Sequence, residues 1–498
     1  MSRATDFLQL DPGSAPVRGL TGWLANGLRA AITDGRLGAG TSLPASRALA
    51  DDLGISRGVV VEAYQRLKDE GLVSARPGLG TKVTTDSALP PAAHDVVAPT
   101  VPALPPPAHD VVAPTVPALQ PAAQPRERLQ ATLPRRWRDG AELDLSPGVP
   151  DLSGFPRAAW LRAERHVLTH ASVRDLGYPD LRGIRWLRTE LAGWLSRTRG
   201  LRTDPDDIIV VTGVAQALTL LAQQLHAGGS TEIAIEDPGS RGCRDLFAYW
   251  GLRPVPIPVD EDGVRVADLR RTGLRAAMLT PAHQFPTGVV LAPGRRRDLL
   301  DWAAGTGALV IEDDYDAEFR YDRAPVPALH ASAPDHIAYA GSTSKTLAPG
   351  MRLGWLIAPA RMHADLLTAK HAADLGCPAL PQMVLARLIA TGELERHIRQ
   401  VRKRQRIRRD SLLAAVREHL PHARVGGIAA GLHLLLTFPG LDTPDTEIAE
   451  RMLEAGVLVH PLSLHCQGDE APGIVLGYAA HTPDQLSDAI RRVASIVL

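Results

Sequence analysis

Near the start of the chain, apolar residues recur with the period of a helix. Four of them share one face because they stand at every fourth position: Leu20, Leu24, Leu28 and Ile32. Two shorter helices are predicted downstream, since each follows a serine that can act as an N-cap and precedes a glycine that can end a helix. Ser46 and Gly54 bound the first of them, and Ser56 and Gly71 bound the second.

These helices are followed by a segment typical of a two-stranded wing. It covers residues 72–83 and carries Gly78 and Gly80 at its tip. Two capped helices joined by a short turn form a helix-turn-helix, whose second helix enters the DNA major groove with its N-terminus first. This places Arg57 near base edges or phosphates. We therefore predict a winged helix-turn-helix DNA-binding domain over residues 1–85.

From residue 135 to the end, short apolar runs typical of strands alternate with stretches typical of helices. The runs cover residues 208–212, 233–236, 276–280, 309–313, 337–340 and 353–358. Strands that alternate with helices predict an α/β domain with a mainly parallel sheet. Ligands of such sheets bind beyond the carboxyl ends of the strands, so the polar segments that follow these runs are the candidate site.

Between the two patterns, residues 86–134 form a linker rich in proline and alanine. Residues 93–104 recur 15 residues later as 108–119. Two copies are too few for a solenoid, and the prolines favour an extended polyproline II conformation. The linker is predicted to be a semi-rigid spacer, and a recent duplication in a segment that tolerates any length is an equally compatible origin.

The composition narrows the class of protein. Lys plus Arg equals Asp plus Glu, at 55 each, so any contact with DNA must come from a local basic patch. The three cysteines are far apart and exclude a disulfide framework, and the 17 histidines show no paired-ligand spacing, so we expect no metal site. Without a signal peptide or an apolar run of membrane-spanning length, we expect a cytoplasmic protein with no membrane partner.

The strongest chemical signal is Lys345, at the end of a run of small residues. A lysine amine can form a Schiff base with the aldehyde of pyridoxal 5′-phosphate (PLP). Ser342 and Ser344 offer hydroxyls to the phosphate of this cofactor, and Arg352 offers a planar cationic fork.

Other segments at strand ends suit the same cofactor. Asp313 closes one run, and a buried acid there can pair with the pyridine nitrogen and keep it protonated. Tyr315, two residues on, can donate to the phenolate oxygen. The segment 213–218 opens a helix, whose first amides can hold a phosphate.

The N-terminal motifs resemble the winged helix of the GntR superfamily of bacterial regulators. They are LPASRALA (43–50), AYQRL (63–67) and GLGT (78–81). The order of motifs along the whole chain resembles the MocR subfamily, in which a fold-type I aminotransferase-like domain follows the winged helix. These motifs are SPGVPD (146–151), YPDLRG (178–183), HQFPTG (283–288), EDDYDAEFRY (312–321) and SKTLAPGMRLG (344–354).

The resemblance implies a fold and a set of cofactor contacts. The effector domain would cover residues 135–498, with a smaller C-terminal α+β subdomain over about 375–498. Lys345 would be the Schiff-base lysine, Asp313 the partner of the pyridine nitrogen and Tyr315 the partner of the phenolate oxygen. The groups that would hold the phosphate are Arg352, Ser342, Ser344 and the amides of Gly213, Val214 and Ala215.

The resemblance also implies partners. The protein would be a head-to-tail homodimer in which Tyr178 reaches the phosphate of the neighbouring subunit. Two winged helices would read a double-stranded DNA operator with two half-sites. The residues implied to contact DNA are Arg47, Ser56, Arg57, Gly78, Gly80 and Lys82.

The sequence departs from the pattern of an active aminotransferase in two places. Ser240 stands where relatives commonly carry a tyrosine that stacks on the pyridine ring, which predicts a lower affinity for PLP. The stretch 473–479 is apolar where aminotransferases have an arginine that binds the substrate carboxylate. In the DNA-binding domain, Gly58 replaces a polar residue, so one base contact is expected to be missing or the backbone to approach closely.

We therefore interpret the chain as a PLP-binding transcription regulator that senses PLP, an amine or an amino acid. Two alternatives stay open: an active PLP-dependent aminotransferase with an appended DNA-binding domain, and a regulator that has lost PLP. A basic helix over 396–409 presents Arg396, Arg399, Lys403 and Arg406 on one face. This face is solvated, with Ile398, Val401 and Ile407 packed inward, or it is a second DNA-binding patch.

Overall fold

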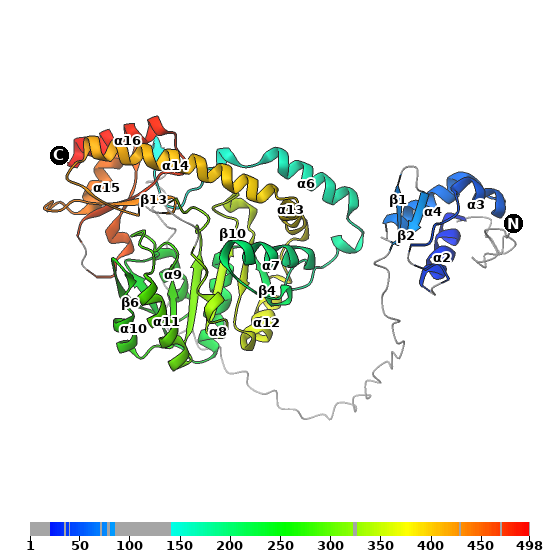
Figure 1. Cartoon of the computed structure of the whole chain (residues 1–498), viewed down its shortest axis with the longest axis horizontal. Coiled ribbons are helices and arrows are strands. Elements are labelled where there is room, and N and C mark those ends of the chain that lie inside the picture. Colours follow the sequence, from blue (N-terminus) through cyan, green and yellow to red (C-terminus); the bar gives the residue numbers. More distant parts are fainter. Residues whose placement is uncertain are drawn as a thin grey trace, which may run out of the picture. The chain divides into compact units, whose positions relative to one another are not determined.

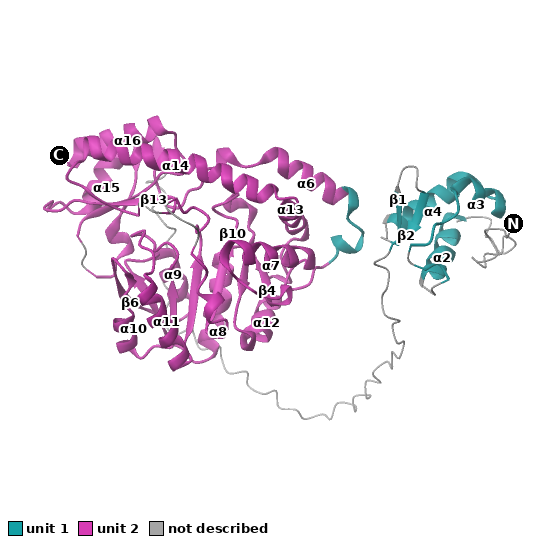
Figure 2. Ribbon diagram, in the orientation of Figure 1, with its two compact units in different colours: residues 1–125, 169–177 teal, residues 126–168, 178–498 magenta. Residues whose placement is uncertain are grey.

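A computed structural model describes residues 20–33, 36–38, 40–69, 72–76, 80–84, 141–321, 326–427, 430–468 and 471–497. The chain divides into two compact units (Figure 2). The first contains residues 1–125 and 169–177, and the second contains residues 126–168 and 178–498. The predicted positions of Gly71 and Gly78 lie outside the described residues.

The N-terminal unit is built from three helices and a two-stranded sheet among its described residues. They are α2 (Leu20–Thr33), α3 (Ser46–Leu53), α4 (Arg57–Asp69), β1 (Val73–Arg76) and β2 (Gly80–Val83). The predicted apolar stripe of α2 faces the core, because Leu24, Leu28 and Ile32 are buried there. The wing is antiparallel, and Val73 pairs with Val83. The predicted winged helix-turn-helix is therefore the observed fold of this unit.

The predicted cap of the first short helix is wrong. Ser46 is the first residue of α3, and Ala45 occupies the N-cap position without a side-chain hydrogen bond. The Ser46 hydroxyl instead accepts from Nε of Arg57 at 3.4 Å. The predicted caps at Ser56 and Gly54 are confirmed, since the Ser56 hydroxyl accepts from the Val59 amide at 3.4 Å and Gly54 ends α3 in the left-handed conformation.

The larger unit contains an eight-stranded sheet in the order β4-β11-β10-β9-β8-β5-β6-β7. Strands β10, β9, β8, β5 and β6 run parallel to one another, whereas β11 runs antiparallel to both β10 and β4, and β7 runs antiparallel to β6. The strands are β4 (Ile208–Val211), β5 (Glu232–Asp237), β6 (Arg253–Asp260), β7 (Gly263–Val264), β8 (Ala276–Leu279), β9 (Leu309–Asp314), β10 (Ile337–Ser342) and β11 (Gly354–Ile357).

Helices cover this sheet, as Figure 1 shows. Separate apolar clusters pack against its strands, one with Tyr339 and Trp355 and another with Ile209 and Leu356. The helices of this part are α6 (Arg157–His170), α7 (Arg185–Arg199), α8 (Val214–Ala227), α9 (Arg241–Tyr249), α10 (Val266–Thr272), α11 (Pro293–Thr306), α12 (His363–Asp374) and α13 (Ala379–Ala390). The prediction of an α/β fold with a mainly parallel sheet is confirmed.

The predicted apolar runs all lie on strands, but one long strand was not predicted. Strand β6 carries prolines at 254, 256 and 258, and prolines argue against a strand. They stand at every second position, so the missing amides all face one side, while intervening residues can bond to β5. On the side of β6 where the proline amides are missing, the neighbour β7 pairs only with Val259 and Asp260. The three prolines therefore leave no hydrogen bond of the sheet unmade.

A smaller C-terminal region packs a four-stranded antiparallel sheet, β12-β13-β16-β15, against helices. Helix α14 runs from this region along the large unit (Figure 1). The elements are α14 (Glu393–His419), β12 (Arg424–Gly426), β13 (His433–Thr437), α15 (Asp445–Glu454), β14 (Val457–Leu458), β15 (His460–Pro461), β16 (Gly473–Gly477) and α16 (Pro483–Val497), and β14 pairs with β3 (Leu143–Asp144).

Helix α14 corrects one detail of the sequence reading. Ile398 and Val401 are buried as predicted, but Ile407 is 53% exposed. Gln405 in the same turn is fully buried, whereas position 407 comes nine residues after Ile398 and therefore lies half a turn around the helix from it, on the exposed face. Within the described residues, no helix is both long enough and apolar enough to cross a membrane.

Candidate functional site

The ends of four adjacent strands bring the predicted site residues to one edge of the large sheet. Strand β10 ends opposite the start of β11, where Ser342 pairs with Gly354, and Gly354 also pairs with Val211 at the end of β4. On the other side, Gly341 pairs with Asp314 at the end of β9. The segments that follow β4, β9 and β10 and precede β11 therefore meet at this edge.

Lys345 lies between this edge and a loop from the start of the larger unit. Its ammonium donates to the carbonyl of Gly148. Gly148 adopts φ +85°, and a Cβ placed there would lie 3.1 Å from Nζ. Burial lowers the pKa of the Lys345 amine against the opposing attraction of Asp316 and Asp313. A lysine with a lowered pKa is more often neutral, and the neutral amine is the nucleophile.

Asp313 is a buried carboxylate that lacks a partner. It is 8% exposed, and its Oδ1 accepts no hydrogen bond from the described residues. Burial, reinforced by Asp314 and Asp316, raises the pKa of Asp313 to about 7. An unpaired buried carboxyl is costly, and a cationic N–H group placed beside it would remove this cost. The residue thus fits the predicted partner of a protonated ring nitrogen.

The hydroxyl of Tyr315 is held by a polar group that the sequence reading did not identify. It donates to the His283 carbonyl at 3.1 Å and lies 3.0 Å from Nδ1 of His283. That nitrogen is also 3.0 Å from Oδ2 of Asp316. His283 and Asp316 belong to the motifs HQFPTG (283–288) and EDDYDAEFRY (312–321). Their place in these motifs is the feature of the sequence that could have predicted a role at the site.

A third residue, His433, joins this group from β13. Its ring centroid lies 4.9 Å from that of His283, and the ligand atoms of His283, Asp316 and His433 lie within 4.8 Å of one another. Nothing in the sequence predicted this grouping, because three distant segments supply it. The His283 ring is enclosed by backbone, since a Cβ on Gly431 would lie 1.9 Å from it.

Arg352 and Gly213 form the end of the site near α8. The guanidinium nitrogens of Arg352 lie 3.3 Å from the position a Cβ would take on Gly213, which adopts φ +101°. No described residue forms a hydrogen bond or ion pair with this guanidinium. Helix α8 begins at Val214, and the first amides of a helix have no partner within it. Cationic donors without acceptors suit an anion such as a phosphate.

The remaining predicted phosphate contacts lie at the end of β10, just after it, and in the first turn of α8. Ser342 is buried, and its hydroxyl accepts from the amide of Ser344 at 3.3 Å. Val214 and Ala215 are the first residues of α8. Tyr178 is 90% exposed on the loop before α7, so it does not enter the site of its own chain. Its predicted reach into a neighbouring subunit stays a prediction.

The two departures from an aminotransferase have a structural setting. The Ser240 hydroxyl caps α9 by accepting from the Cys243 amide at 3.4 Å. The apolar stretch that lacks the arginine includes β16, which is buried along its length. Val475 of this strand pairs with His460 and Leu435. Burial lowers the pKa of His460 to about 4 and that of His465 to about 3, so these side chains are uncharged at neutral pH.

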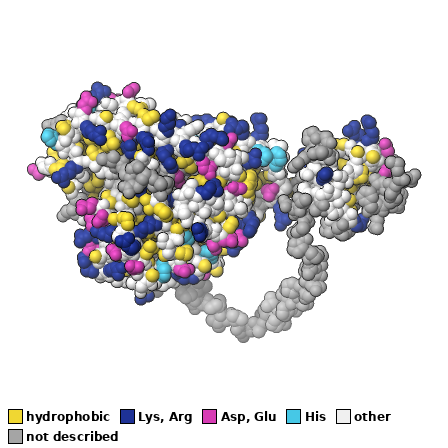
Figure 3. Space-filling view, in the orientation of Figure 1, with side chains coloured by type: hydrophobic (Ala, Val, Ile, Leu, Met, Phe, Trp, Pro, Cys, Tyr) yellow, Lys and Arg dark blue, Asp and Glu magenta, His cyan; other side chains and the backbone are white. Residues whose placement is uncertain are grey.

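The predicted DNA contacts lie on exposed parts of the N-terminal unit. Arg57 opens α4, Arg47 stands in the first turn of α3, and Lys82 is exposed on the wing, where it pairs with Ser74. Gly80 adopts φ +76° at the start of β2. Basic side chains gather over α3 and α4 in Figure 3, whereas the visible face of the larger unit mixes both signs of charge.

Comparisons with known proteins agree on two families. Residues 22–83 match the bacterial regulatory proteins of the gntR family, and residues 142–493 match aminotransferase class I and II. The chain is 32% identical to the HTH-type pyridoxine biosynthesis transcriptional regulator PdxR of Corynebacterium glutamicum, over 98% of this chain and 97% of that protein. It is 31% identical to the probable rhizopine catabolism regulatory protein MocR of Rhizobium meliloti, over 95% and 92%.

Solved structures similar to the chain are aminotransferases. An archaeal alanine:glyoxylate aminotransferase is 27% identical with a TM-score of 0.67, and covers 72% of this chain and 92% of its own. LysN, the α-aminoadipate aminotransferase of Thermus thermophilus, is 26% identical with a TM-score of 0.66, and covers 74% and 95%. The latter was solved with N-(5′-phosphopyridoxyl)-L-leucine.

Proposed function

Because this chain belongs to the MocR-type bacterial regulators, which join a gntR-family DNA-binding domain to a class I and II aminotransferase domain, we propose that it is a transcription regulator that binds PLP. The observation that carries this proposal is the edge of the large sheet. It holds a partly buried lysine, a buried carboxylate and, against the start of a helix, a guanidinium, and the latter two have no partner among the described residues.

In this proposal each residue has one task. Lys345 attaches the cofactor covalently, Asp313 keeps the ring nitrogen protonated, and Tyr315 donates to the phenolate oxygen. The phosphate is held by Arg352, Ser342, Ser344 and the amides of Gly213, Val214 and Ala215. When bound, PLP supplies an aldehyde for an amine and a ring that withdraws electrons.

The groups around Tyr315 then have a positioning role. His283 and Asp316 fix the Tyr315 hydroxyl through contacts of 3.0–3.1 Å. Burial raises the pKa of Tyr315 well above its usual value, so the hydroxyl keeps its proton and remains a donor.

The same site supports regulation rather than turnover. The strand that would carry the carboxylate-binding arginine is buried and apolar, and the nearby imidazoles are uncharged. A lost charge-assisted hydrogen bond weakens binding by about 1.5–3 kcal/mol. We infer that the domain senses PLP itself, or an amine or amino acid that reaches the bound cofactor, and does not transaminate at an appreciable rate.

The DNA-binding task falls to the N-terminal unit. We propose that Arg47, Ser56, Arg57, Gly78, Gly80 and Lys82 contact a double-stranded operator. A head-to-tail homodimer would present two winged helices to two half-sites, with Tyr178 of each subunit at the phosphate of the other. The proposed organisation is a reader over 1–85, a linker over 86–134 and an effector domain over 135–498, in a cytoplasmic protein.

An active aminotransferase is the second candidate. The observation that favours it is that the lysine, aspartate and tyrosine of the site share one edge, in a fold seen in solved aminotransferases. Steady transamination of a common amino acid by the purified protein would establish this candidate and contradict the proposal.

The experiment that tests the regulatory proposal measures binding to DNA. Fragments selected by the protein from a random pool would be labelled, and their anisotropy followed with and without PLP. A change in affinity or site size on adding PLP supports the proposal. Tight binding that is indifferent to PLP would contradict it.

A further inference from the structure

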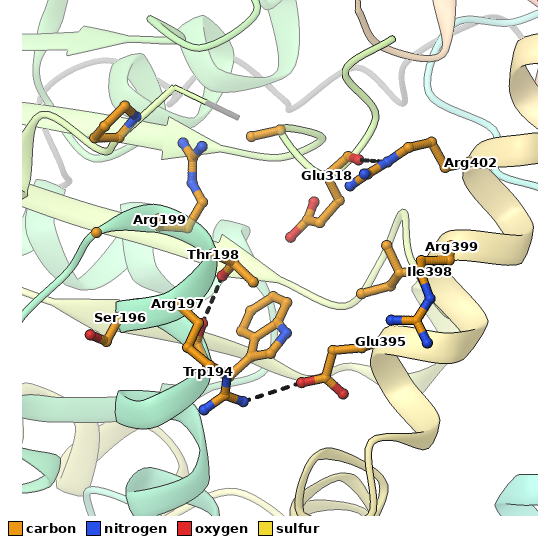
Figure 4. A pocket seen from close by; sticks show the side chains of 13 residues that line it. Trp194, Ser196, Arg197, Thr198, Arg199, Glu318, Glu395, Ile398, Arg399 and Arg402 are labelled. Atoms are coloured by element: carbon orange, nitrogen blue, oxygen red, sulfur yellow. Dashed lines mark hydrogen bonds and ion pairs between the residues drawn. The ribbon is translucent and has the colours of Figure 1, made fainter. Parts of the chain in front are cut away.

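A second cavity lies on the larger unit, apart from the residues proposed to hold PLP. It has a volume of about 450 Å³, within the range of small-molecule pockets. The end of α7, the segment after β9, Pro327 and the start of α14 form its walls (Figure 4). Its lining residues are Trp194, Ser196, Arg197, Thr198, Arg199, Gly200, Ala317, Glu318, Pro327, Glu395, Ile398, Arg399 and Arg402.

Two buried donors that line this cavity have no partner among the described residues. Arg199 is 2% exposed, and its Nη2 makes no hydrogen bond. Its other donors are used, since Nε donates to Oδ2 of Asp314 at 2.6 Å and Nη1 to the Val326 carbonyl at 2.5 Å. The indole Nε1 of Trp194 is likewise buried without a partner. A ligand that reached either atom would satisfy it without breaking an existing contact.

The charge of the lining favours an anion. The lining set contains four arginines and two glutamates. Arg197 pairs with Glu395 at 3.2 Å, and Arg402 donates through Nε to the Glu318 carbonyl at 2.7 Å, whereas Arg399 has no partner within the described part of the chain. Burial and the nearby Asp314 raise the pKa of Glu318 to about 7, so this carboxyl opposes an anion only weakly at neutral pH.

The rest of the wall is apolar. The indole of Trp194 faces α14 in Figure 4, with Ile398 on the opposite side. Ala317 and Pro327 add further apolar surface. We propose that this cavity binds a small organic anion, a carboxylate or phosphate ester with a flat apolar part that lies beside Trp194 and a charged group held by Arg399.

The cavity lies next to the segment that carries Tyr315, so a ligand bound there can influence the edge of the sheet that we propose binds PLP. Ala317 and Glu318 follow Tyr315 and Asp316 directly in the chain. Arg199 also holds Asp314, the neighbour of Asp313. A bound anion would therefore fix the segment that carries Tyr315, which makes the cavity an effector site distinct from the one proposed for PLP.

The test is a titration of the full-length protein with benzoate, phenyl phosphate and benzyl alcohol, followed by ligand-observed NMR. Both anions should bind, and the neutral alcohol should bind at least tenfold more weakly. Arg399→Gln should weaken both anions about tenfold or more. Lys403→Gln removes the same charge one turn away, outside the lining set, and should leave binding unchanged.

Two controls keep the result decisive. The absorption spectrum with PLP should be the same for Arg399→Gln and the parent protein, which shows that the variant is folded and that its cofactor site is separate. The titrations are made on protein loaded with one equivalent of PLP, so that the probes do not occupy the site proposed for PLP. Equal binding of the alcohol, or unchanged affinity in Arg399→Gln, would each overturn the proposal.

Discussion

The guanidinium of Arg352 lies against the backbone of Gly213, with both terminal nitrogens 3.3 Å from the point where a Cβ would stand. The two residues come from different segments, one before β11 and one after β4. Their approach aims a cation at the start of α8. We propose that this arrangement binds the phosphate group of PLP.

Replacing Gly213 by alanine is predicted to weaken PLP binding about tenfold or more, because the new methyl displaces the guanidinium. The left-handed φ adds about 1 kcal/mol of strain. Gly229→Ala is the matched control, since Gly229 has φ +85° with no atom within 4 Å. Both variants should lose similar stability in denaturant titrations, and only Gly213→Ala should lose affinity for PLP. Equal affinities would contradict the assignment.

The pair formed by Arg199 and Asp314 is predicted to be important for stability. Both side chains are nearly fully buried, and their atoms lie 2.6 Å apart. Arg199→Met leaves an uncompensated buried carboxylate and should cost about 3–5 kcal/mol of unfolding free energy. Breaking the exposed pair Arg451–Glu447 should cost less than about 1 kcal/mol. Denaturant unfolding of both variants compares the two, and a similar loss would show that the buried pair has no special role.

The buried Asp313 predicts how the stability of the cofactor-free protein depends on pH. Its folded pKa of about 7 lies above the ordinary value of 3.8, so the folded state binds the proton more tightly than the unfolded state. Stability contributed by this group is therefore full below pH 3.8 and is lost as pH rises to about 7. Asp313→Asn should remove this loss, on the order of a few kcal/mol, and flatten the profile between these limits.

In Asp313→Asn the stability still depends on pH through Glu236 and Glu312, because burial raises the pKa of each to about 7 as well. The comparison is therefore between the parent protein and Asp313→Asn, each melted at a series of pH values without PLP. The variant should also bind PLP more weakly. If the stability of Asp313→Asn varied with pH as steeply as that of the parent protein, the raised pKa of Asp313 would be contradicted.

Arg57 is predicted to contact DNA from the first residue of α4. Arg57→Ala should weaken operator binding by about 1–3 kcal/mol if it reads a base, or lower the salt dependence by about one ion if it contacts a phosphate. Arg66→Ala is the control on the last turn of the same helix, where Arg66 pairs with Glu62. Anisotropy at several salt concentrations separates these outcomes. Parallel curves for Arg57→Ala and Arg66→Ala would exclude the contact.

Much of the fold follows from local patterns. The apolar runs over 309–313 and 337–340 became the neighbouring parallel strands β9 and β10, because strands buried on both faces need continuous apolar residues. The run over 208–212 became β4, which is buried along its length at the edge of the same sheet. Strand β6 was not predicted because its three prolines argue against a strand. The structure tolerates them because β6 forms a long row of hydrogen bonds on one side only, toward β5. The exposure of Ile407 was predicted wrongly because this residue lies half a helical turn around α14 from the buried Ile398.

Some residues of the candidate site were likewise predictable from local sequence patterns, whereas others depend on tertiary packing. Lys345, Asp313 and Arg352 were predicted together because adjacent strand ends meet at one edge, whatever the details of packing. The contact of His283 with Asp316 and His433 depends on how β13 docks on the large sheet. The cavity beside Arg199 depends on the approach of α7 to α14. Such groupings arise from tertiary packing, which no single segment encodes.

The most direct test of the central claim is the absorption spectrum of the purified protein titrated with PLP. We predict a visible band from the covalent bond between PLP and Lys345. This band should be absent in Lys345→Ala and retained in Lys403→Ala, which removes an exposed lysine of α14. A parent protein without the band, or a band that survives in Lys345→Ala, would contradict the assignment of Lys345 as the residue that holds the cofactor.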